Sequence, residues 1–123
     1  MYEISIRTHF SAAHHLRDYD GKCAKQHGHN WLVEVYCRCE KLNEVGMGID
    51  FVDLKREVNA LLDRMDHSDL NEMEYFKEHN PTAERIAKDL FDRLSARFGD
   101  ETASVSKVTV YETPNCAASY IPD

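Results

Sequence analysis

Apolar and polar residues alternate along residues 2–14, as in a strand with one buried face. The inward positions of this segment are Ile4, Ile6, Thr8, Phe10, Ala12 and His14. A second alternation follows a polar turn at residues 18–21, and its inward positions are Trp31, Val33, Val35, Cys37 and Cys39. The pattern therefore predicts two strands, each with one face toward a core.

Two later segments repeat apolar residues at helical spacing. In the first, Asp50 is a candidate N-cap, and the apolar positions are Leu54, Val58, Leu61, Leu62 and Met65. The second begins within residues 80–84, where Pro81 suits a first helical turn, and we expect it to stop at Gly99. Two more strands are expected around residues 105–113 and 117–121.

The predicted order of elements is ββααββ, which favours an α+β fold. We expect an antiparallel four-stranded sheet with both helices on one face. At 123 residues the chain fits a single domain over residues 1–123.

Composition narrows the classes of partner. The 22 acidic and 15 basic residues give a formal net charge of −7, and no basic run exceeds a pair, which argues against nucleic acid. No apolar run approaches the roughly 18 residues of a membrane span, and residues 1–5 lack a secretory pattern. We therefore expect a soluble, cytoplasmic protein with no membrane partner and with its four cysteines as free thiols.

The segment His27-Gly28-His29 places two imidazoles on the same side of an extended strand. They share the parity of Trp31, and His14 shares the apolar parity of the first strand, so three imidazoles extend from buried strand faces. Three neutral nitrogen ligands with a fourth position open are typical of a catalytic zinc site. A His-x-His pair is also common on surfaces without metal, and spacing alone leaves both interpretations open.

Cys23 lies between Lys22 and Lys25, four residues before His27. A nearby cation or metal favours the thiolate, which makes this residue a candidate base or nucleophile. The alternative is an inert thiol.

Asp66 and His67 follow the first helical segment, and an acid beside a histidine can tune a proton carrier. Adjacent side chains rarely hydrogen-bond each other well, so a solvated helix end is an equal alternative. Glu112 shares the parity of the apolar positions of its strand, and a buried carboxylate needs a partner. That partner is either a ligand with two parallel N–H donors or a strand neighbour such as Lys107.

Taken in order, these segments resemble the 6-pyruvoyl- and 6-carboxytetrahydropterin synthase family over nearly the whole chain. The matching segments are residues 10–14, 23–30, 49–51, 66–71, 80–84 and 112–113. The resemblance implies the tunnelling fold (T-fold), in which subunits assemble into barrels. It also implies a homo-oligomer, usually a hexamer made of two trimers, with active sites between subunits.

The resemblance further implies roles for individual residues. One zinc ion per subunit is bound by His14, His27 and His29. The substrate is 7,8-dihydroneopterin triphosphate, from which the Cys23 thiolate removes a carbon-bound proton while Asp66 and His67 pass protons. Glu112 anchors the pterin, with Thr82 and Glu84 as further contacts. Ala83 stands where relatives often have Ser or Thr, which removes one hydroxyl contact.

Two features select a branch within the family. Cys23 stands where folate-pathway relatives carry Glu, and the three residues between Cys23 and His27 resemble the bacterial queuosine branch. We therefore expect a zinc-dependent lyase that forms 6-carboxy-5,6,7,8-tetrahydropterin, acetaldehyde and triphosphate in queuosine biosynthesis. The alternatives are a 6-pyruvoyl-tetrahydropterin synthase with the same machinery and a structural zinc-binding module without turnover.

Overall fold

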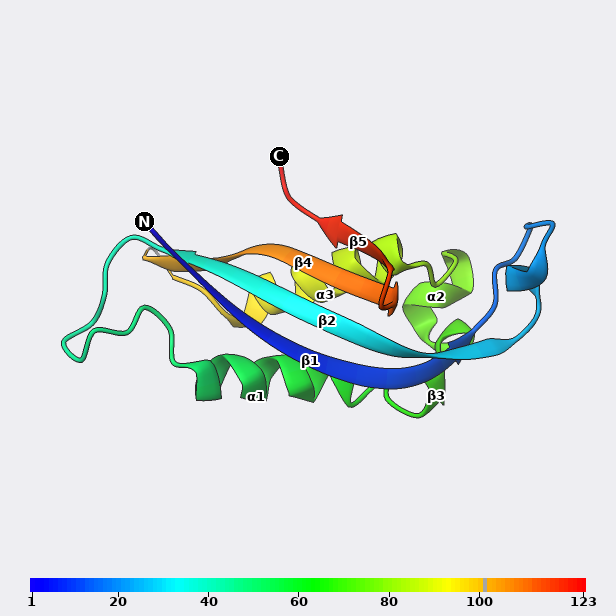
Figure 1. Cartoon of the computed structure of the whole chain (residues 1–123), viewed down its shortest axis with the longest axis horizontal. Helices are drawn as coiled ribbons and strands as arrows, with labels where there is room; N and C mark the ends of the chain where they lie inside the picture. Colours follow the sequence, from blue (N-terminus) through cyan, green and yellow to red (C-terminus); the bar gives the residue numbers. More distant parts are fainter. Residues whose placement is uncertain (101) are drawn as a thin grey trace.

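The computed structural model describes residues 1–100 and 102–123, and within them a single mixed sheet is covered by helices (Figure 1). The five strands are β1 (Tyr2–His14), β2 (His27–Cys39), β3 (Ser68–Asp69), β4 (Ala103–Thr113) and β5 (Cys116–Tyr120). Their order in the sheet is β3-β1-β2-β4-β5. The four longer strands pair with one another in antiparallel fashion, and the short β3 pairs in parallel with the end of β1.

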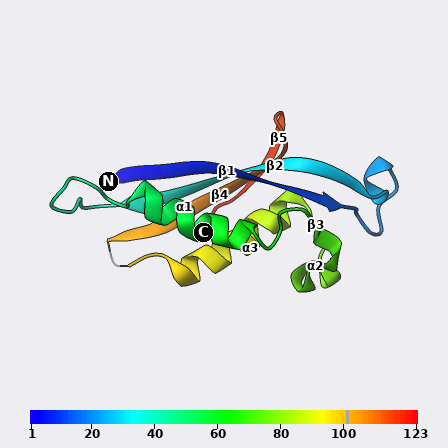
Figure 2. The same ribbon diagram turned by 90° about the horizontal axis from the view of Figure 1, so that it is seen from below.

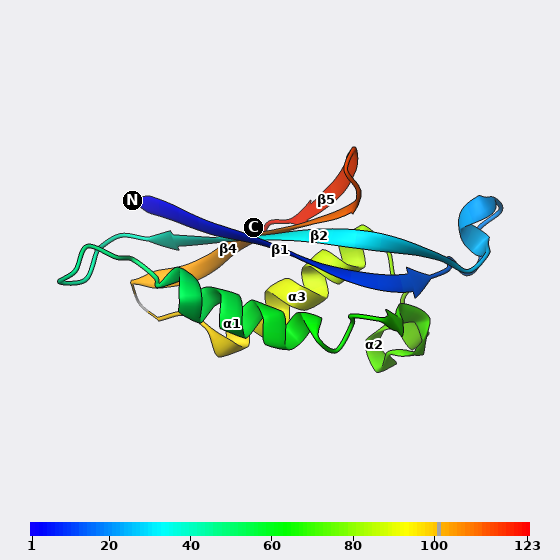
Figure 3. The same ribbon diagram turned by 60° about the horizontal axis from the view of Figure 1, so that its bottom comes forward.

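The described residues form three helices, and the two longest of them lie along one face of the sheet. The three helices are α1 (Phe51–Leu62), α2 (Glu74–Glu78) and α3 (Ala83–Arg97), with short 3₁₀ turns η1 (Lys22–Ala24) and η2 (Leu70–Glu72). Figures 2 and 3 show α1 and α3 on the same side of the strands, where α1 packs on β1 and α3 packs on β4 and β5. None of the helices described here has the length and apolar character needed to cross a membrane.

The core lies between this face of the sheet and the two long helices. Phe10 of β1 and Trp31 of β2 are paired in register and stack with ring centroids 5.9 Å apart. The buried side chains of α1 and α3 that face them include Leu54, Val58, Leu61, Ile86, Leu90 and Leu94. Cys37 and Cys39 are buried as free thiols, which confirms their assignment to the core.

The sheet and the set of helices differ from the predicted ββααββ arrangement. The sheet has a fifth strand, because the chain after α1 runs alongside β1 and pairs Ser68 with Ala12 and Asp69 with Ala13. A third helix, α2, precedes α3. The described chain thus confirms the α+β class, whereas the predicted count of four strands and two helices was wrong.

The start of α3 differs from the predicted one, whereas the start of α1 does not. Thr82 is the N-cap of α3, since its hydroxyl oxygen accepts a hydrogen bond from the backbone N–H of Arg85 at 3.2 Å. Pro81 therefore precedes the helix and does not occupy its first turn. Asp50 caps α1 as predicted, through a 2.8 Å hydrogen bond from the N–H of Val52.

Leu54 and Val52 test which face of α1 stabilises the fold. Leu54 is fully buried, whereas Val52 is 68% exposed. Leu54→Ala should lower the free energy of unfolding by about 2–5 kcal/mol, because it removes buried apolar atoms and leaves a cavity. Val52→Ala, the control in the same helix, should change it by less than about 0.5 kcal/mol. Equal losses for the two variants in urea unfolding would contradict this packing.

Candidate active site

Three histidines meet at the end of the β1–β2 hairpin. In the antiparallel register His14 lies opposite His27, and Ala12 lies opposite His29. The three rings are mutual neighbours, with centroids 4.6 Å apart for His14 and His27, 5.2 Å for His14 and His29, and 4.8 Å for His27 and His29. The predicted clustering of these three imidazoles is therefore confirmed.

Glu112 of β4 completes the cluster. Its Oε1 lies 2.8 Å from Nε2 of His29 and 3.6 Å from Nε2 of His14. The register between β4 and β5 shifts between Tyr111 and Thr113, so Glu112 lies at a bulge, a device that re-aims side chains near functional sites. The alternative in which Glu112 pairs with Lys107 was wrong, because the Lys107 ammonium lies 4.1 Å from the centroid of the Tyr36 ring.

Backbone carbonyls hold two of the imidazoles in place. Nδ1 of His14 lies 2.8 Å from the carbonyl oxygen of Pro81, and Nδ1 of His27 lies 2.6 Å from that of Lys25. A carbonyl only accepts, so each Nδ1 carries a proton, and in the neutral form of each ring the free lone pair is then on Nε2. Burial lowers the pKa of His14, which favours the neutral ring that binds a metal.

The donor set fits a divalent metal ion. Within the described residues, one ligand atom from each of His14, His27, His29 and Glu112 lies within 4.8 Å of all the others. Nε2 of His14 and Nε2 of His29 are buried and make no hydrogen bond within the described structure. Buried polar atoms without partners are costly, and a shared metal ion would satisfy both.

Trp31 forms the floor of the cluster. It is fully buried, and its ring lies 4.8 Å from that of His14 and 5.2 Å from that of His29, nearly perpendicular to both. Its Nε1 donates a 3.2 Å hydrogen bond to the carbonyl of Ala12. Since Trp31 is the only tryptophan in the chain, its fluorescence reports on this site alone.

Two asparagine amides fix the chain that leaves β1. Asn71 accepts from the N–H of His15 at 2.9 Å and donates to its carbonyl at 3.0 Å. Asn80 pairs in the same two ways with Arg17, at 2.9 Å for both bonds. Each amide pairs with the backbone as a neighbouring strand would, so together they hold the segment after His14. Sequence reasoning missed these roles, because nothing local marks an asparagine whose partner lies 56 or 63 residues away.

A cavity of about 200 Å³ adjoins the cluster, between the start of α3 and the β4–β5 turn. Its lining residues are Ala83, Glu84, Glu112, Cys116, Ala117 and Ala118. The structure thus places Glu84 and Glu112 on the same cavity, and their contact with a ligand stays a prediction. Thr82 is outside this lining, and its hydroxyl caps α3.

Cys23 lies in η1, which belongs to the loop that joins β1 to β2; this loop extends beyond the end of the two strands in Figure 1. It is half-buried and has a free thiol. Its carbonyl accepts a 2.8 Å hydrogen bond from the N–H of Leu16, which ties the two arms of the hairpin together.

The side chains of Asp66 and His67 approach each other, although the two residues are adjacent in the chain. The His67 side chain is 82% exposed, which fits the alternative of a solvated segment end, yet Oδ2 of Asp66 lies 3.0 Å from Nδ1 of His67. The reason is the left-handed backbone at His67, with φ of 58°, which folds its ring back toward Asp66. The N–H of Ser11 donates to Oδ1 of Asp66 at 2.9 Å, and this bond, followed by the contact with His67, lowers the pKa of Asp66.

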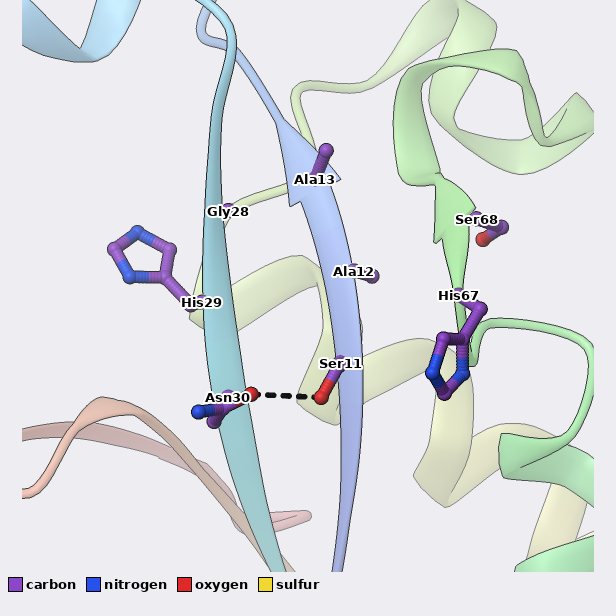
Figure 4. Close-up of a pocket in the computed structure, with 8 residues that line it drawn as sticks. All are labelled: Ser11, Ala12, Ala13, Gly28, His29, Asn30, His67 and Ser68. Carbon is purple, nitrogen blue, oxygen red and sulfur yellow. Dashed lines mark hydrogen bonds between the residues drawn. The ribbon is translucent and has the colours of Figure 1, made fainter.

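His67 and the histidine cluster lie on different sides of the hairpin. In Figure 4, the His29 ring points away from β2 on one side of the β1–β2 ribbon, whereas His67 extends from the segment just before β3 on the other side. An open depression of about 450 Å³ on the His67 side is lined by Ser11, Ala12, Ala13, Gly28, His29, Asn30, His67 and Ser68. Ser11 donates a 2.7 Å hydrogen bond to Asn30 there. One chain therefore brings the histidine–carboxylate cluster and the cavity together, and of the cluster residues His29 also lines the depression beside His67.

Comparisons with known proteins agree with this fold. The chain is 44% identical over 94 residues, 76% of both sequences, to a putative 6-carboxy-5,6,7,8-tetrahydropterin synthase of Archaeoglobus fulgidus. It is 30% identical over 128 residues to a Bacillus subtilis protein of the same name, covering 98% of this chain and 86% of that one. The structure of Caenorhabditis elegans 6-pyruvoyl tetrahydropterin synthase superposes with a TM-score of 0.89 at 31% identity, covering 99% and 96% of the two chains.

The fold is thus that of the tetrahydropterin synthases, and the described residues carry a histidine–carboxylate cluster at the end of the β1–β2 hairpin. The family model described as 6-pyruvoyl tetrahydropterin synthase matches residues 3–123, and the chain belongs to that family.

Metal binding should be visible through Trp31. Titration with Co²⁺ should quench its fluorescence, because the ion would bind beside the ring, and EDTA should restore it. His27→Ala should weaken Co²⁺ binding by roughly tenfold or more, whereas His9→Ala, an exposed control in β1, should not change it. If the two variants bound Co²⁺ equally well, the metal would lie elsewhere.

The lowered pKa of Asp66 predicts an acid-dependent loss of stability. A carboxylate with a depressed folded pKa stabilises the protein above its unfolded value of about 3.9, and this contribution is lost as the pH falls through the folded value. The free energy of unfolding of wild type minus that of Asp66→Asn should therefore be positive and constant above about pH 5 and shrink below about pH 4. A difference that stayed constant down to pH 3 in urea unfolding would contradict the hydrogen bond from Ser11.

Proposed function

We propose that the protein is a zinc-dependent 6-carboxy-5,6,7,8-tetrahydropterin synthase of queuosine biosynthesis. Its reaction would convert 7,8-dihydroneopterin triphosphate and water to 6-carboxytetrahydropterin, acetaldehyde and triphosphate. The observation that carries the proposal is the position of Glu112, which borders both the imidazole cluster and the cavity beside Glu84. The names of the Archaeoglobus and Bacillus relatives support the carboxy product.

The cavity suits the polar edge of a pterin ring. That edge presents an amino group and a ring N–H side by side, and a carboxylate accepts two such parallel donors well. Glu112 would accept this pair, with Glu84 available for a further N–H. The alanines at positions 83, 117 and 118 leave room for a flat ring. Binding there would place the substrate side chain toward the histidines.

His14, His27 and His29 would hold the zinc ion through their Nε2 atoms, because the Nδ1 atoms of His14 and His27 face carbonyls. The bound ion would supply Lewis acidity to the hydroxyl oxygens of the substrate side chain. The rigid floor at Trp31 and the two asparagine clamps would keep the ligand atoms in place.

Proton transfer would fall to Cys23, Asp66 and His67. The Cys23 thiolate would take a carbon-bound proton, and its position on the hairpin between two ligands supports that role. His67, oriented by Asp66, would donate or accept protons at its exposed ring. Since His67 lies across the hairpin from the cluster of its own chain, the proposal requires a second subunit to supply it. We therefore propose a homo-oligomer, a dimer of trimers, with sites between subunits.

Two other functions use the same residues. The Caenorhabditis structure bears the name of a 6-pyruvoyl tetrahydropterin synthase, so that product is the second candidate. A structural metal module without turnover is the third. The cavity beside Glu84 favours an enzyme over this module, because a structural site has no need of a carboxylate-lined cavity next to the metal ligands.

Product analysis tests the proposal. Zinc-loaded protein incubated with 7,8-dihydroneopterin triphosphate should release acetaldehyde and 6-carboxytetrahydropterin, identified by mass spectrometry. Cys23→Ala should lower kcat by about 10²-fold or more, the usual contribution of a general base, while zinc content and circular dichroism stay unchanged. Formation of 6-pyruvoyl-tetrahydropterin would establish the second candidate. Unchanged substrate with folded, zinc-loaded protein would leave the structural module.

A further inference from the structure

Glu112 belongs to two environments at once. Its carboxylate is 30% exposed and lines the cavity that also contains Glu84, yet its Oε1 touches the imidazole cluster. No other residue of the described chain is part of both the four-residue cluster and that cavity lining. The same carboxylate is therefore available to a metal on one side and to a ligand on the other.

The position of Oε1 matches that of a fourth metal ligand. Zinc lies about 2.0–2.2 Å from nitrogen and oxygen ligands, so two ligand atoms on one ion are roughly 3–3.5 Å apart. Oε1 of Glu112 lies 2.8 Å from Nε2 of His29 and 3.6 Å from Nε2 of His14, which brackets this separation. A small displacement of one carboxylate would bring both distances into the range of a shared ion.

A simple pair between Glu112 and a protonated His29 explains the geometry less well. Such a pair would be a charge-assisted hydrogen bond with N–H aimed at the oxygen. Nε2 of His29 instead makes no hydrogen bond within the described structure, although Oε1 lies only 2.8 Å away. Two close atoms without hydrogen-bond alignment fit two ligands that point toward a common ion.

We propose that Glu112 is the fourth ligand of the resting metal site and that pterin binding removes it from the metal. The ring would draw the carboxylate into the cavity beside Glu84, and the vacated position would become available to the side-chain hydroxyls of the same substrate. Glu112 thereby links recognition of the pterin ring to the release of one coordination position on the metal. The second part of this inference rests on the proposed function, since it requires that pterin binds in the cavity.

The metal and the pterin ring would compete for the carboxylate of Glu112. If metal and pterin ring share one carboxylate, each weakens the binding of the other by the same factor. A pterin that carries side-chain hydroxyls compensates, because those hydroxyls can replace the lost carboxylate. A pterin without them cannot.

The first experiment asks whether Glu112 binds the metal. The visible absorption and affinity of Co²⁺ are measured in wild type, Glu112→Gln and Glu34→Gln. The control removes the same charge from β2, where Glu34 pairs with Arg7 at 2.9 Å. Glu112→Gln should change the intensity of the Co²⁺ band and lower affinity by roughly tenfold or more, and Glu34→Gln should match wild type. Identical bands and affinities in all three proteins would overturn the fourth-ligand role.

The second experiment uses wild-type protein only, so it does not depend on how a variant folds. Co²⁺ affinity is measured with saturating 6-methylpterin, which lacks hydroxyls, and with neopterin, which has them. 6-Methylpterin should weaken Co²⁺ binding by about tenfold, and neopterin by much less. Binding of 6-methylpterin without any change in Co²⁺ affinity would overturn the exchange. If neither pterin binds at equilibrium dialysis, the proposed function fails, while the result for Glu112→Gln still decides the fourth ligand.

Discussion

The antiparallel pairing of β1 with β2 is the constraint on which the rest of the structure depends. It places His14 opposite His27, and it places His29, two residues further along β2, opposite Ala12. Because side chains alternate between faces, a slip of one residue would turn the histidines of β2 to the other side of the sheet. The stacked pair of Phe10 and Trp31, also opposite each other, opposes such a slip, since it would expose two large rings. The packing of the core and the placement of the ligands are therefore one requirement.

This arrangement leaves unmet polar groups in a buried place. Nε2 of His14 and Nε2 of His29 lack hydrogen-bond partners in the described structure, which costs folding free energy of about 1–3 kcal/mol per group. Contacts around the site keep these imidazoles in place despite that cost. The Asn71 and Asn80 amides pair with the backbone beyond β1, and the Pro81 carbonyl fixes the His14 ring. Unpaired buried polar atoms of this kind are expected where a site is arranged for a ligand.

Strand parity predicted more of the site than of the fold. Alternation in β1 and β2 was enough to place three histidines together, and parity placed Glu112 on the inner face. Its partner was not predictable, because the contact with His29 depends on β4 lying next to β2 and on the bulge at Glu112. The dipeptide β3 is too short to show alternation. The pairing of Asp66 with His67 depends on one left-handed residue, which nothing in the local sequence marks.

The central claim is that one site combines a metal held by imidazoles with a pterin held by carboxylates. The most direct test is a crystal structure grown with zinc and neopterin, with anomalous diffraction recorded at the zinc absorption edge. The account predicts one anomalous peak bound by Nε2 of His14, His27 and His29, and a pterin ring between Glu84 and Glu112. A zinc peak away from these nitrogens, or a ring bound outside that cavity, would contradict it.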